Sequence, residues 1–267
     1  MAERSGEELL RSFLTGEEAR LRRFRGAVRH VPSSDHCKLC AAPFEGPSGF
    51  VFRHLGFPRF AGNPAICSSC IRSLQKMGVA GAEIPVSLLF ADIRGSTGLG
   101  ERLSPSDFRA VLAAFYQAAL PAVLLNDGLV DKFVGDEVIG LFFAGVTGPD
   151  HAVAAIRSAN DLLDRVGRSD ASSLGAIPVG AAVHTGLAFV GSSGTDGQVN
   201  DFTALGDVVN TTARLAGEAG AGELVATNDA LQAARIDGAS SERRAIDVRG
   251  RAEPIDVVTL RTTEPAE

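Results

Sequence analysis

The stretch Ile84-Pro-Val-Ser-Leu-Leu-Phe-Ala-Asp-Ile-Arg-Gly-Ser-Thr97 decides the fold that this sequence predicts. Between Val86 and Ala91 both alternating sets of side chains are mostly apolar, which is typical of a short strand buried on both faces. The strand ends at Asp92 and passes into a polar turn, whose backbone N–H groups are free to bind an anion. Such a carboxylate and turn can hold a metal ion and the phosphates that it neutralises. An aspartate after a strand is also a common turn former or helix cap. Whether Asp92 binds a metal therefore depends on the motifs in the rest of the chain.

Length and composition narrow the class of protein. The 267 residues suffice for one large domain and a small module, and 45% of them are hydrophobic, as in ordinary globular proteins. No apolar run approaches the length of a membrane span and the N-terminus lacks the apolar core of a signal peptide, so we expect a cytoplasmic protein without membrane insertion. The formal charge of −6 argues against nucleic-acid binding, although a metal and a few arginines can still meet the phosphates of a nucleotide.

The first 30 residues predict an N-terminal helical segment. The apolar side chains that recur there at helical spacing are Leu9, Leu10, Phe13, Leu14, Leu21 and Phe24. Five arginines surround the second half, so we expect a single surface helix over residues 5–29 with a solvated basic face. A dimerisation or regulatory helix that packs on a partner is the alternative.

Four cysteines form two pairs, Cys37 with Cys40 and Cys67 with Cys70, each spaced C-x2-C. In a cytosolic chain two such pairs are typical of a zinc site with four thiolate ligands. The segment between the pairs is too poor in apolar residues for a core of its own, so a bound metal ion is expected to stabilise it. We expect one structural Zn²⁺ in a module of residues 31–77, with the second pair opening a helix as in treble-clef modules. Reduced buried cysteines or a redox-active dithiol are the alternatives.

Residues 78–83 predict a linker, and the main domain is expected over residues 84–262. Ser104-Pro105-Ser-Asp107 has the capping side chain, the first-turn proline and the acid that favour a helix start. Gly135-Asp136 predicts the turn of a hairpin between two short apolar strands, residues 129–134 and 138–143. Further predictions are a helix over 149–166, a strand pair over 177–183 and 187–190 that turns near Thr185-Gly186, a helix after Gly206, and strands over 223–227, 245–250 and 255–260.

This order of elements predicts an α+β domain with helices on one face of a mostly antiparallel sheet. If the strands pair, Asp92 and Asp136 lie at the same end of the sheet, where two carboxylates can hold two metal ions for phosphoryl transfer. Asn210 and Arg214 are four residues apart, so an amide and a guanidinium share one helix face and suit the charge that develops on phosphoryl oxygens. His184, on an apolar strand, is expected to be a core or strand-end residue.

Three motifs occur in order along the main domain: Phe90-Ala-Asp92-Ile-Arg-Gly-Ser-Thr97, Lys132-Phe-Val-Gly135-Asp136 and Gly206-Asp-Val-Val-Asn210-Thr-Thr-Ala-Arg214. Together they resemble the class III nucleotidyl cyclases, over about residues 84–260. The resemblance implies a ferredoxin-like catalytic fold that works as a head-to-tail homodimer, with two equivalent sites at the interface. The implied reaction is attack of the ribose 3′-hydroxyl on the α-phosphorus, with release of pyrophosphate and closure of a 3′,5′-cyclic nucleotide.

The same resemblance implies a role for each matching residue. Asp92 and Asp136 would bind two Mg²⁺ or Mn²⁺ ions, and Asn210 and Arg214 would stabilise the transition state. The substrate-binding residues would be Lys132 and Thr203 for the base, Ile93, Gly95, Ser96 and Thr97 in the turn, and Arg249, from the basic segment 248–251, for the outer phosphates. In the homodimer the metal aspartates of one chain would face the base-reading and Asn/Arg residues of the other.

Two of these residues bear on the choice of nucleotide. A lysine at position 132 is the choice of the adenine-type members, so ATP is the expected substrate. Many adenylyl cyclases carry an aspartate where this chain has Thr203, and the threonine pattern is that of a subgroup that includes bicarbonate-responsive enzymes. A hydroxyl can both accept and donate, so the base is less firmly fixed than with aspartate. Bicarbonate sensitivity is therefore a hypothesis, which unchanged turnover in a pH-controlled bicarbonate series would contradict.

Three other functions remain as alternatives. Gly135-Asp136-Glu137-Val138 is similar to the hairpin of diguanylate cyclases, but Val134 breaks the double glycine of that motif. A second alternative is a regulatory domain that binds nucleotide without turnover, and a third is a cyclase for GTP or a pyrimidine nucleotide. An unidentified regulatory ligand or protein is a further possible partner, because the residues of the N-terminal module do not identify a signal.

Overall fold

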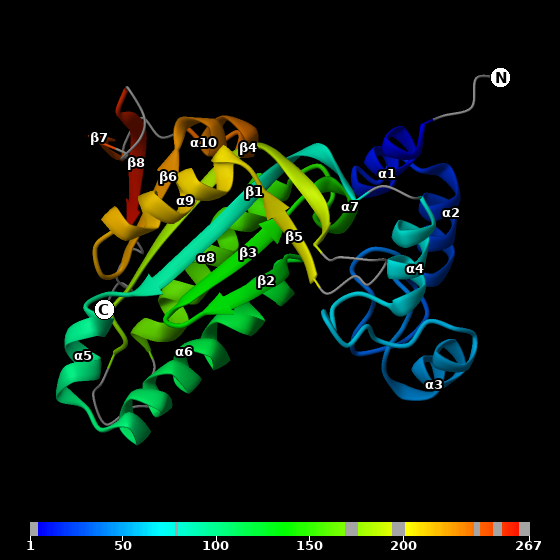
Figure 1. The fold of residues 1–267 in the computed structure, drawn as a ribbon, viewed down its shortest axis with the longest axis horizontal. Helices are drawn as coiled ribbons and strands as arrows, with labels where there is room; N and C mark the ends of the chain where they lie inside the picture. The colour runs from blue at the N-terminus through cyan, green and yellow to red at the C-terminus, as the bar shows by residue number, and fades with distance from the viewer. Residues whose placement is uncertain are drawn as a thin grey trace. The chain divides into compact units, whose positions relative to one another are not determined.

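The computed structural model of the chain describes residues 5–77, 80–168, 176–193, 201–237, 241–247 and 253–261. Figure 1 shows its helices and strands in chain order from blue to red. The helices are α1 (Gly6–Leu14), α2 (Ala19–Val28), α3 (Gly46–His54), α4 (Ser68–Lys76), α5 (Ser96–Arg102), α6 (Pro105–Leu125), α7 (Ala144–Thr147), α8 (His151–Gly167), α9 (Asp207–Glu218) and α10 (Asn228–Ala234). The strands are β1 (Gly81–Ile93), β2 (Leu129–Val134), β3 (Glu137–Phe142), β4 (Val179–Ser193), β5 (Asp201–Leu205), β6 (Glu223–Thr227), β7 (Glu242–Ile246) and β8 (Ile255–Arg261).

The strands form one sheet in the order β2-β3-β1-β4-β6-β8-β7, and β5 pairs with β4. The pairs β1–β3, β2–β3, β4–β5, β6–β8 and β7–β8 are antiparallel, and β4–β6 is parallel. The predicted α+β class with a mostly antiparallel sheet is therefore confirmed. β1 lies inside the sheet, and its residues Val86–Ala91 are all buried, as the two-sided apolar pattern predicted.

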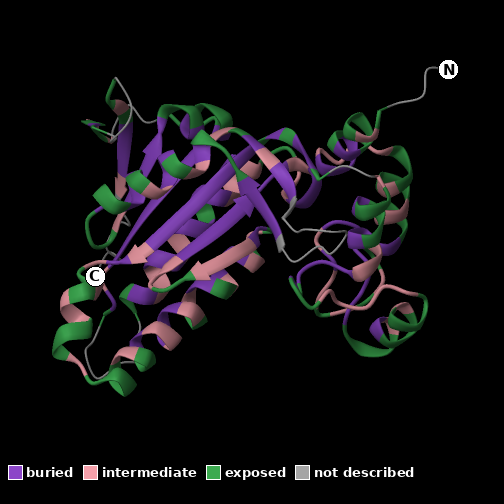
Figure 2. Ribbon diagram, in the orientation of Figure 1, coloured by how far each residue is buried: buried purple, intermediate pink, exposed green. Residues whose placement is uncertain are grey.

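One face of the sheet shares an apolar core with α6, α8 and α10. Figure 2 shows the buried strands in purple and exposed residues in green on the outer sides of α6 and α10. The predicted inner face of α8 is buried in this core: Ala152, Ala155, Ile156, Ala159, Leu162 and Leu163. The hairpin of β2 and β3 and the start of α6 also agree with the prediction, since Ser104 caps α6 by accepting a hydrogen bond from Asp107 N at 3.2 Å.

α9 lies on the opposite face of the sheet, which corrects the expectation that all helices cover one face. The odd-numbered residues Val179, Ala181 and Val183 of β4 point into the core under α8. The even-numbered Gly180 and Gly186 instead face α9, since a Cβ atom on them would come within 2.6 Å of Ala219 O and 3.1 Å of Val208 Cγ2. By the same alternation Asp92 of β1 is on the α9 side, because Leu89, Ala91 and Ile93 face the other core.

β4 is one continuous strand, so the predicted turn near Thr185-Gly186 is wrong. The glycine at 186 lies where α9 packs closely on β4, because a Cβ atom there would come within 3.1 Å of Val208 Cγ2, which would have to shift to accommodate it. The partner of the second half of β4 is β5, with Phe189 opposite Leu205 and Gly191 opposite Thr203.

The expected single N-terminal helix is two helices, α1 and α2. They are separated at Gly16, which has φ +75° and therefore cannot continue a right-handed helix. α1 buries the apolar side chains Leu10, Phe13 and Leu14 and exposes its charged side. In α2 Arg25 donates hydrogen bonds to Gly145 O at 2.7 Å and Val146 O at 3.0 Å, so the basic face is partly bound to α7.

The contacts of the chain divide it into two compact units. One unit contains Met1–Pro85, Phe143–Pro149 and Leu187–Leu205, and the other contains Val86–Phe142, Asp150–Gly186 and Gly206–Glu267. The first unit therefore takes in α7 and β5 as well as the cysteine module. β1 begins at Gly81, inside the segment 78–83 that was expected to be a linker. The domain limits 1–30, 31–77 and 84–262 stay predictions.

α6 corrects the statement that no apolar run approaches the length of a membrane span. Within the described residues it is the one helix that reaches this length and apolarity, on composition alone. Pro121 lies inside this helix. Val111, Phe115 and Ala119 of α6 are buried in the core shared with α8.

Candidate active site

The end of β1 and the turn between β2 and β3 bring Asp92 and Asp136 to the same end of the sheet. Ile93 N donates to Asp136 O at 3.1 Å, and Asp92 is the direct cross-strand partner of Glu137. Because cross-strand partners point to the same face, the side chains of Asp92 and Glu137 are neighbours. This placement was predicted for the two aspartates.

Two features of the sequence fix the turn that carries Asp136. Gly135 has φ +61°, a conformation that glycine adopts without strain, which favours glycine at this position. Tyr116 of α6 donates its hydroxyl hydrogen to Gly135 O, and its ring packs on Phe133 of β2 with centroids 4.4 Å apart. The turn is thus held from the helix layer as well as by the hairpin.

Arg94 is the cation of this site. Its Nη2 forms an ion pair with Asp92 Oδ1, its Nη1 donates to Gly217 O at 2.8 Å, and its backbone N donates to Pro178 O at 2.6 Å. Burial lowers the pKa of Arg94, while the charges of Asp136, Glu137 and Glu218 act in the opposite direction. Burial, and then the charge of Asp136, raise the pKa of Glu137.

The donor set suits a hard divalent cation. Asp92 Oδ1 is buried and accepts no hydrogen bond, so its one described contact is the guanidinium of Arg94. Carboxylate oxygens and, with them, phosphate oxygens are the ligands that Mg²⁺ and Mn²⁺ prefer. Asp92 and Asp136 therefore fit two such ions, which stay a prediction.

The segment after Asp92 differs from the polar turn that was expected. Gly95, with φ +68°, precedes α5, so Ser96 and Thr97 form the first turn of a short helix. Leu99 N donates to Gly95 O at 3.0 Å, which uses one amide of this segment for the helix itself. The proposed contacts of Ile93, Gly95, Ser96 and Thr97 with substrate stay predictions.

The two predicted base-reading residues lie in different compact units. Lys132 follows an irregularity in β2 at Asp131, with which it forms an ion pair of 3.6 Å, and its side chain is 38% exposed. Thr203 is buried in β5, opposite Gly191 of β4.

The predicted transition-state residues lie on α9. Asn210 and Arg214 are both exposed and one helical turn apart, as expected from their spacing. Side chains that are exposed in one chain, as these two are, remain available to complete a site on a second chain. Arg249 lies outside the described residues.

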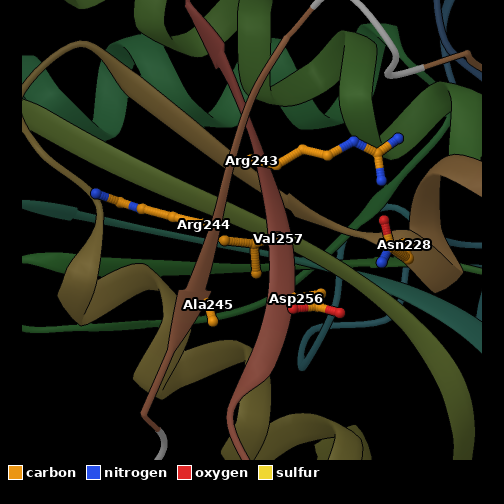
Figure 3. Close-up of a pocket in the computed structure, with 6 residues that line it drawn as sticks. All are labelled: Asn228, Arg243, Arg244, Ala245, Asp256 and Val257. Atoms are coloured by element: carbon orange, nitrogen blue, oxygen red, sulfur yellow. The ribbon is translucent and has the colours of Figure 1, made fainter.

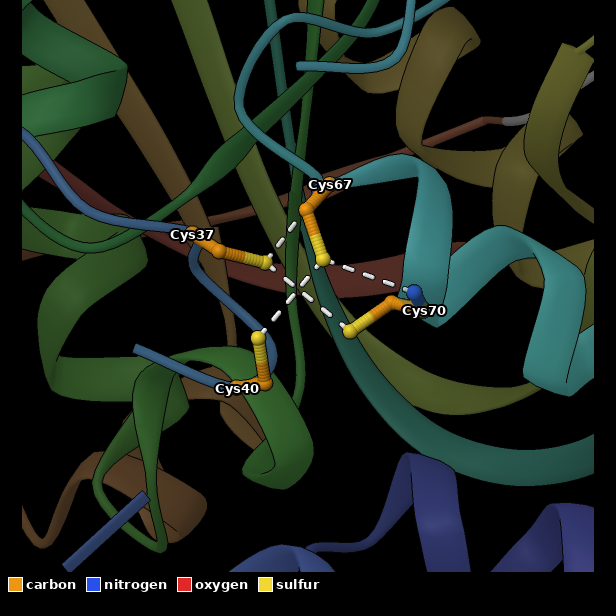
Figure 4. Close-up of side chains that lie close together, drawn as sticks. All are labelled: Cys37, Cys40, Cys67 and Cys70. Carbon is orange, nitrogen blue, oxygen red and sulfur yellow. Dashed lines mark hydrogen bonds between the residues drawn. The ribbon is translucent and has the colours of Figure 1, made fainter. Parts of the chain in front are cut away.

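The four cysteines of the N-terminal module converge on one point. Figure 4 shows their sulfur atoms facing one another, with Cys37 Sγ 3.9 Å from Cys70 Sγ and Cys40 Sγ 3.7 Å from Cys67 Sγ. Tetrahedral coordination by four thiolates, with Zn–S bonds of about 2.3 Å, requires sulfur atoms about 3.8 Å apart, so the cluster fits Zn²⁺. All four are buried and unlinked by disulfides, and their ligand atoms lie within 4.8 Å of one another. The zinc ion itself stays a prediction.

Cys67 also begins α4, as predicted. Its Sγ accepts a hydrogen bond from Cys70 N at 3.4 Å, which caps the helix. Hydrogen bonds from the neighbouring thiols, that of Cys37 first, lower the pKa of Cys67. Hydrogen bonds within the same cluster raise the pKa of Cys40 and Cys70, whereas binding of a metal ion by all four residues requires each as a thiolate.

A separate cavity of about 250 Å³ lies beside β7 and β8. Figure 3 shows Arg243, Asp256 and Asn228 on the same side of these strands, whereas Arg244 points away from them. None of the predicted site residues within the described part of the chain lines this cavity.

The sequence analysis did not recognise three features of the site region. Arg94 and Glu137 adjoin the predicted aspartates, and the register of the hairpin was the signal that could have found Glu137. No local pattern signals that Arg94 reaches Gly217. At the other end of the β1–β3 pair, where Ser87 is opposite Phe142, Ser87 Oγ lies 2.9 Å from His151 Nδ1 and 2.7 Å from Thr185 Oγ1, and burial lowers the pKa of His151. His184, as expected, is a buried strand residue, with Nδ1 2.9 Å from Thr227 Oγ1.

This fold, with two carboxylates at one end of its sheet, defines the class of nucleotidyl cyclase domains. The model of the adenylate and guanylate cyclase catalytic domain matches residues 80–261, and the chain belongs to this family. The resemblance and the ferredoxin-like cyclase fold inferred from the motifs are thereby confirmed.

Curated relatives include the adenylate cyclase of Anabaena cylindrica, 29% identical over 60% of this chain and 33% of its own length. Adenylate cyclase 2 of Rhizobium meliloti is 36% identical over 48% of this chain and 36% of its own length. The aligned part thus spans only about a third of these relatives.

Solved structures with the same fold include the adenylyl cyclase CyaB from P. aeruginosa, with 26% identity and a TM-score of 0.58 over 68% of this chain and 95% of that chain. The guanylyl cyclase Cya2 is similar in fold, with a TM-score of 0.62 at 24% identity over 68% of this chain and 93% of that chain.

Proposed function

We propose that the protein is an adenylyl cyclase that converts ATP into 3′,5′-cyclic AMP and pyrophosphate at the interface of a cytoplasmic homodimer. The observation that carries this proposal is the placement of Asp92 and Asp136 at one end of the sheet, in a chain that belongs to the cyclase family. The names of the relatives add support, since both curated relatives described above are adenylate cyclases.

In this proposal each active site takes its metal-binding residues from one subunit and its transition-state residues from the other. Asp92 and Asp136 would hold two Mg²⁺ or Mn²⁺ ions, and the bound ions would supply Lewis acidity to the reacting hydroxyl and the phosphates. The 3′-hydroxyl would lose its proton to solvent water. Its oxygen would bond to the α-phosphorus while the bond from that phosphorus to the bridging oxygen breaks and pyrophosphate leaves. Asn210 and Arg214 of the second subunit donate hydrogen bonds to the oxygens on which negative charge grows.

The remaining residues select and orient the nucleotide. Lys132 donates to a ring nitrogen of adenine and Thr203 accepts from its amino group. The amides of Ile93, Gly95, Ser96 and Thr97 and the side chain of Arg249 bind phosphate oxygens. The single structural Zn²⁺ at the four cysteines keeps the N-terminal module folded and takes no part in the reaction.

A turnover assay on the full chain with ATP, GTP, CTP and UTP offered separately, with Mn²⁺ or Mg²⁺, tests the proposal. We expect cyclic AMP as the main product, identified by mass. Asp92→Asn and Asp136→Asn keep the shape of each side chain but remove its charge, so each lowers kcat by at least about 100-fold. Asp107→Asn, on the exposed start of α6, is the matched control and keeps the wild-type rate.

The outcomes separate the alternatives. A different cyclic nucleotide as the main product would retain the reaction and contradict the roles given to Lys132 and Thr203. Nucleotide binding without any product would instead identify a regulatory nucleotide-binding domain.

A further inference from the structure

Arg94 connects the predicted metal carboxylate to the helix that carries Asn210 and Arg214. One end of its guanidinium, Nη2, pairs with Asp92, and the other, Nη1, donates to Gly217 O at 2.8 Å. Its backbone N is fixed on Pro178 O at 2.6 Å, so the residue bridges from the end of β1 rather than from a free loop. All of these residues belong to the same compact unit.

At its α9 end Arg94 provides a hydrogen-bond donor for a carbonyl in the last turn of the helix. α9 ends at Glu218, so the carbonyl of Gly217 has no amide of the same helix to accept from. A cation at the C-terminal end of a helix is also favoured by the helix dipole. Arg244 caps the next carbonyl in the same way, since its Nη2 donates to Glu218 O at 3.1 Å. Arg94 therefore secures the last turn of α9 together with Arg244.

The β1 end of the bridge lies among carboxylates. Glu137 is the cross-strand partner of Asp92, and the charges of Asp136, Glu137 and Glu218 all act on the guanidinium. Without a cation these carboxylates would repel one another. Arg94 and a divalent ion thus satisfy the same negative charge, and both require Asp92 Oδ1. An ion that binds Asp92 through Oδ1 has to displace the guanidinium from that oxygen.

We propose that Arg94 is a positioning residue that closes the metal-free site by pairing with Asp92, and that binding of a divalent cation releases it and loosens the last turn of α9. The inference rests on the proposed function for the assignment of Asp92 as a metal ligand. In the head-to-tail dimer Asp92 of one chain serves one site, whereas Asn210 and Arg214 of that chain serve the other. Metal binding at the Asp92 of one site therefore loosens α9 of the same chain, and this helix carries the Asn210 and Arg214 that serve the other site of the dimer.

The first test measures Mn²⁺ affinity from the electron paramagnetic resonance signal of free Mn²⁺, without nucleotide. Arg94→Met keeps the apolar stem and removes the competing charge, so the variant binds Mn²⁺ about three- to ten-fold more tightly than the wild type. Arg109→Met, on the exposed face of α6, makes the same change in net charge and keeps the wild-type affinity. Weaker or unchanged binding in Arg94→Met overturns the inference, because a purely structural arginine gives one or the other.

The second test measures hydrogen exchange in α9 with and without Mn²⁺. In the wild type Mn²⁺ accelerates exchange in the last turn of α9, and in Arg94→Met exchange there is already fast and does not respond. Arg94→Lys keeps the charge but is too short to hold both ends, so it restores the wild-type Mn²⁺ affinity while leaving the last turn fast. A wild-type α9 that exchanges equally with and without Mn²⁺ overturns the inference.

These readouts do not depend on turnover, so the two proposals can fail separately. If the wild type forms no cyclic nucleotide but both Arg94 results are as expected, the proposed function fails and the inference stands. If the wild type forms cyclic AMP and Arg94→Met keeps its Mn²⁺ affinity, the inference alone fails.

Discussion

Gly145 is a residue at which the N-terminal segment packs closely against α7 of the same unit. A Cβ atom on Gly145 would lie 2.2 Å from Leu14 O and 3.1 Å from Phe13 O, both of which are backbone atoms that cannot move alone. Arg25 donates to the carbonyls of Gly145 and Val146 beside this contact. The absence of a side chain at position 145 thus allows α1 to pack against α7.

We predict that Gly145→Ala lowers the free energy of unfolding by about 2 kcal/mol, because the added methyl forces two backbone segments apart. Gly26→Ala is the matched control, since this glycine lies inside α2 with open space around it. Alanine is the better helix former, so the control raises the free energy of unfolding by about 0.5–1 kcal/mol. Urea titrations of both variants measure the effect, and equal stabilities would contradict the close contact.

At this scale the sequence predicted residues whose neighbours are local. Asp92 and Asp136 were placed together because each follows a recognisable strand, and Asn210 and Arg214 because of their helical spacing. Arg94 was not assigned a function because its partner, Gly217, is remote in the chain and contributes only a backbone carbonyl. The composition of a sequence carries no signal for such a contact.

Among the elements, α4 depends most directly on the cysteine cluster. Cys67 is both a predicted zinc ligand and the residue whose Sγ caps the first turn of α4. Serine is a good capping residue but a poor zinc ligand, so one substitution can separate the two roles.

We predict that the purified protein contains one zinc ion per chain and that Cys67→Ser loses it although the cap is conserved. Residues 37–76 then lose their protection from hydrogen exchange, because the four thiolates join the two halves of the segment. α8, in the other compact unit, keeps its protection. Ser68→Ala, in the same first turn of α4, retains zinc. A Cys67→Ser variant that keeps both metal and protection would show that the cluster is not a zinc site.

Elements were predicted well where hydrophobic periodicity and end signals agreed, as in β1, α6, α8 and the hairpin of β2 and β3. The errors fell at two glycines, Gly186 with a tertiary reason and Gly16 with a local one, its positive φ. Gly186 suggested a turn but makes room for Val208 within β4, and Gly16 was passed over inside an apparently continuous helix that it divides. α5, α7 and α10 were missed because they are short, of four to seven residues.

For the whole molecule, the proposed homodimer makes a quantitative prediction. Asp92→Asn and Asn210→Ala each inactivate both sites of their own dimer. In a mixed dimer one site combines the intact Asp92 of one chain with the intact Asn210 of the other. Equal mixing after reversible dissociation should therefore restore about a quarter of the wild-type rate, since about half of the dimers are mixed and each has one working site.

The control for this experiment mixes Asp92→Asn with Asp136→Asn. Both changes disable the same half of a site, so no combination of these chains has a complete one. Activity in this control, or none in the first mixture, would contradict a site shared between two chains.

The contact between Leu14 and Gly145 also bears on how such a chain can change during evolution. A recombination event that replaces the N-terminal module must bring in a new α1 whose end still fits against the backbone at Gly145 of α7. The two segments are therefore expected to be inherited together, and a module from another lineage would need a matching substitution at α7 before the two could be joined.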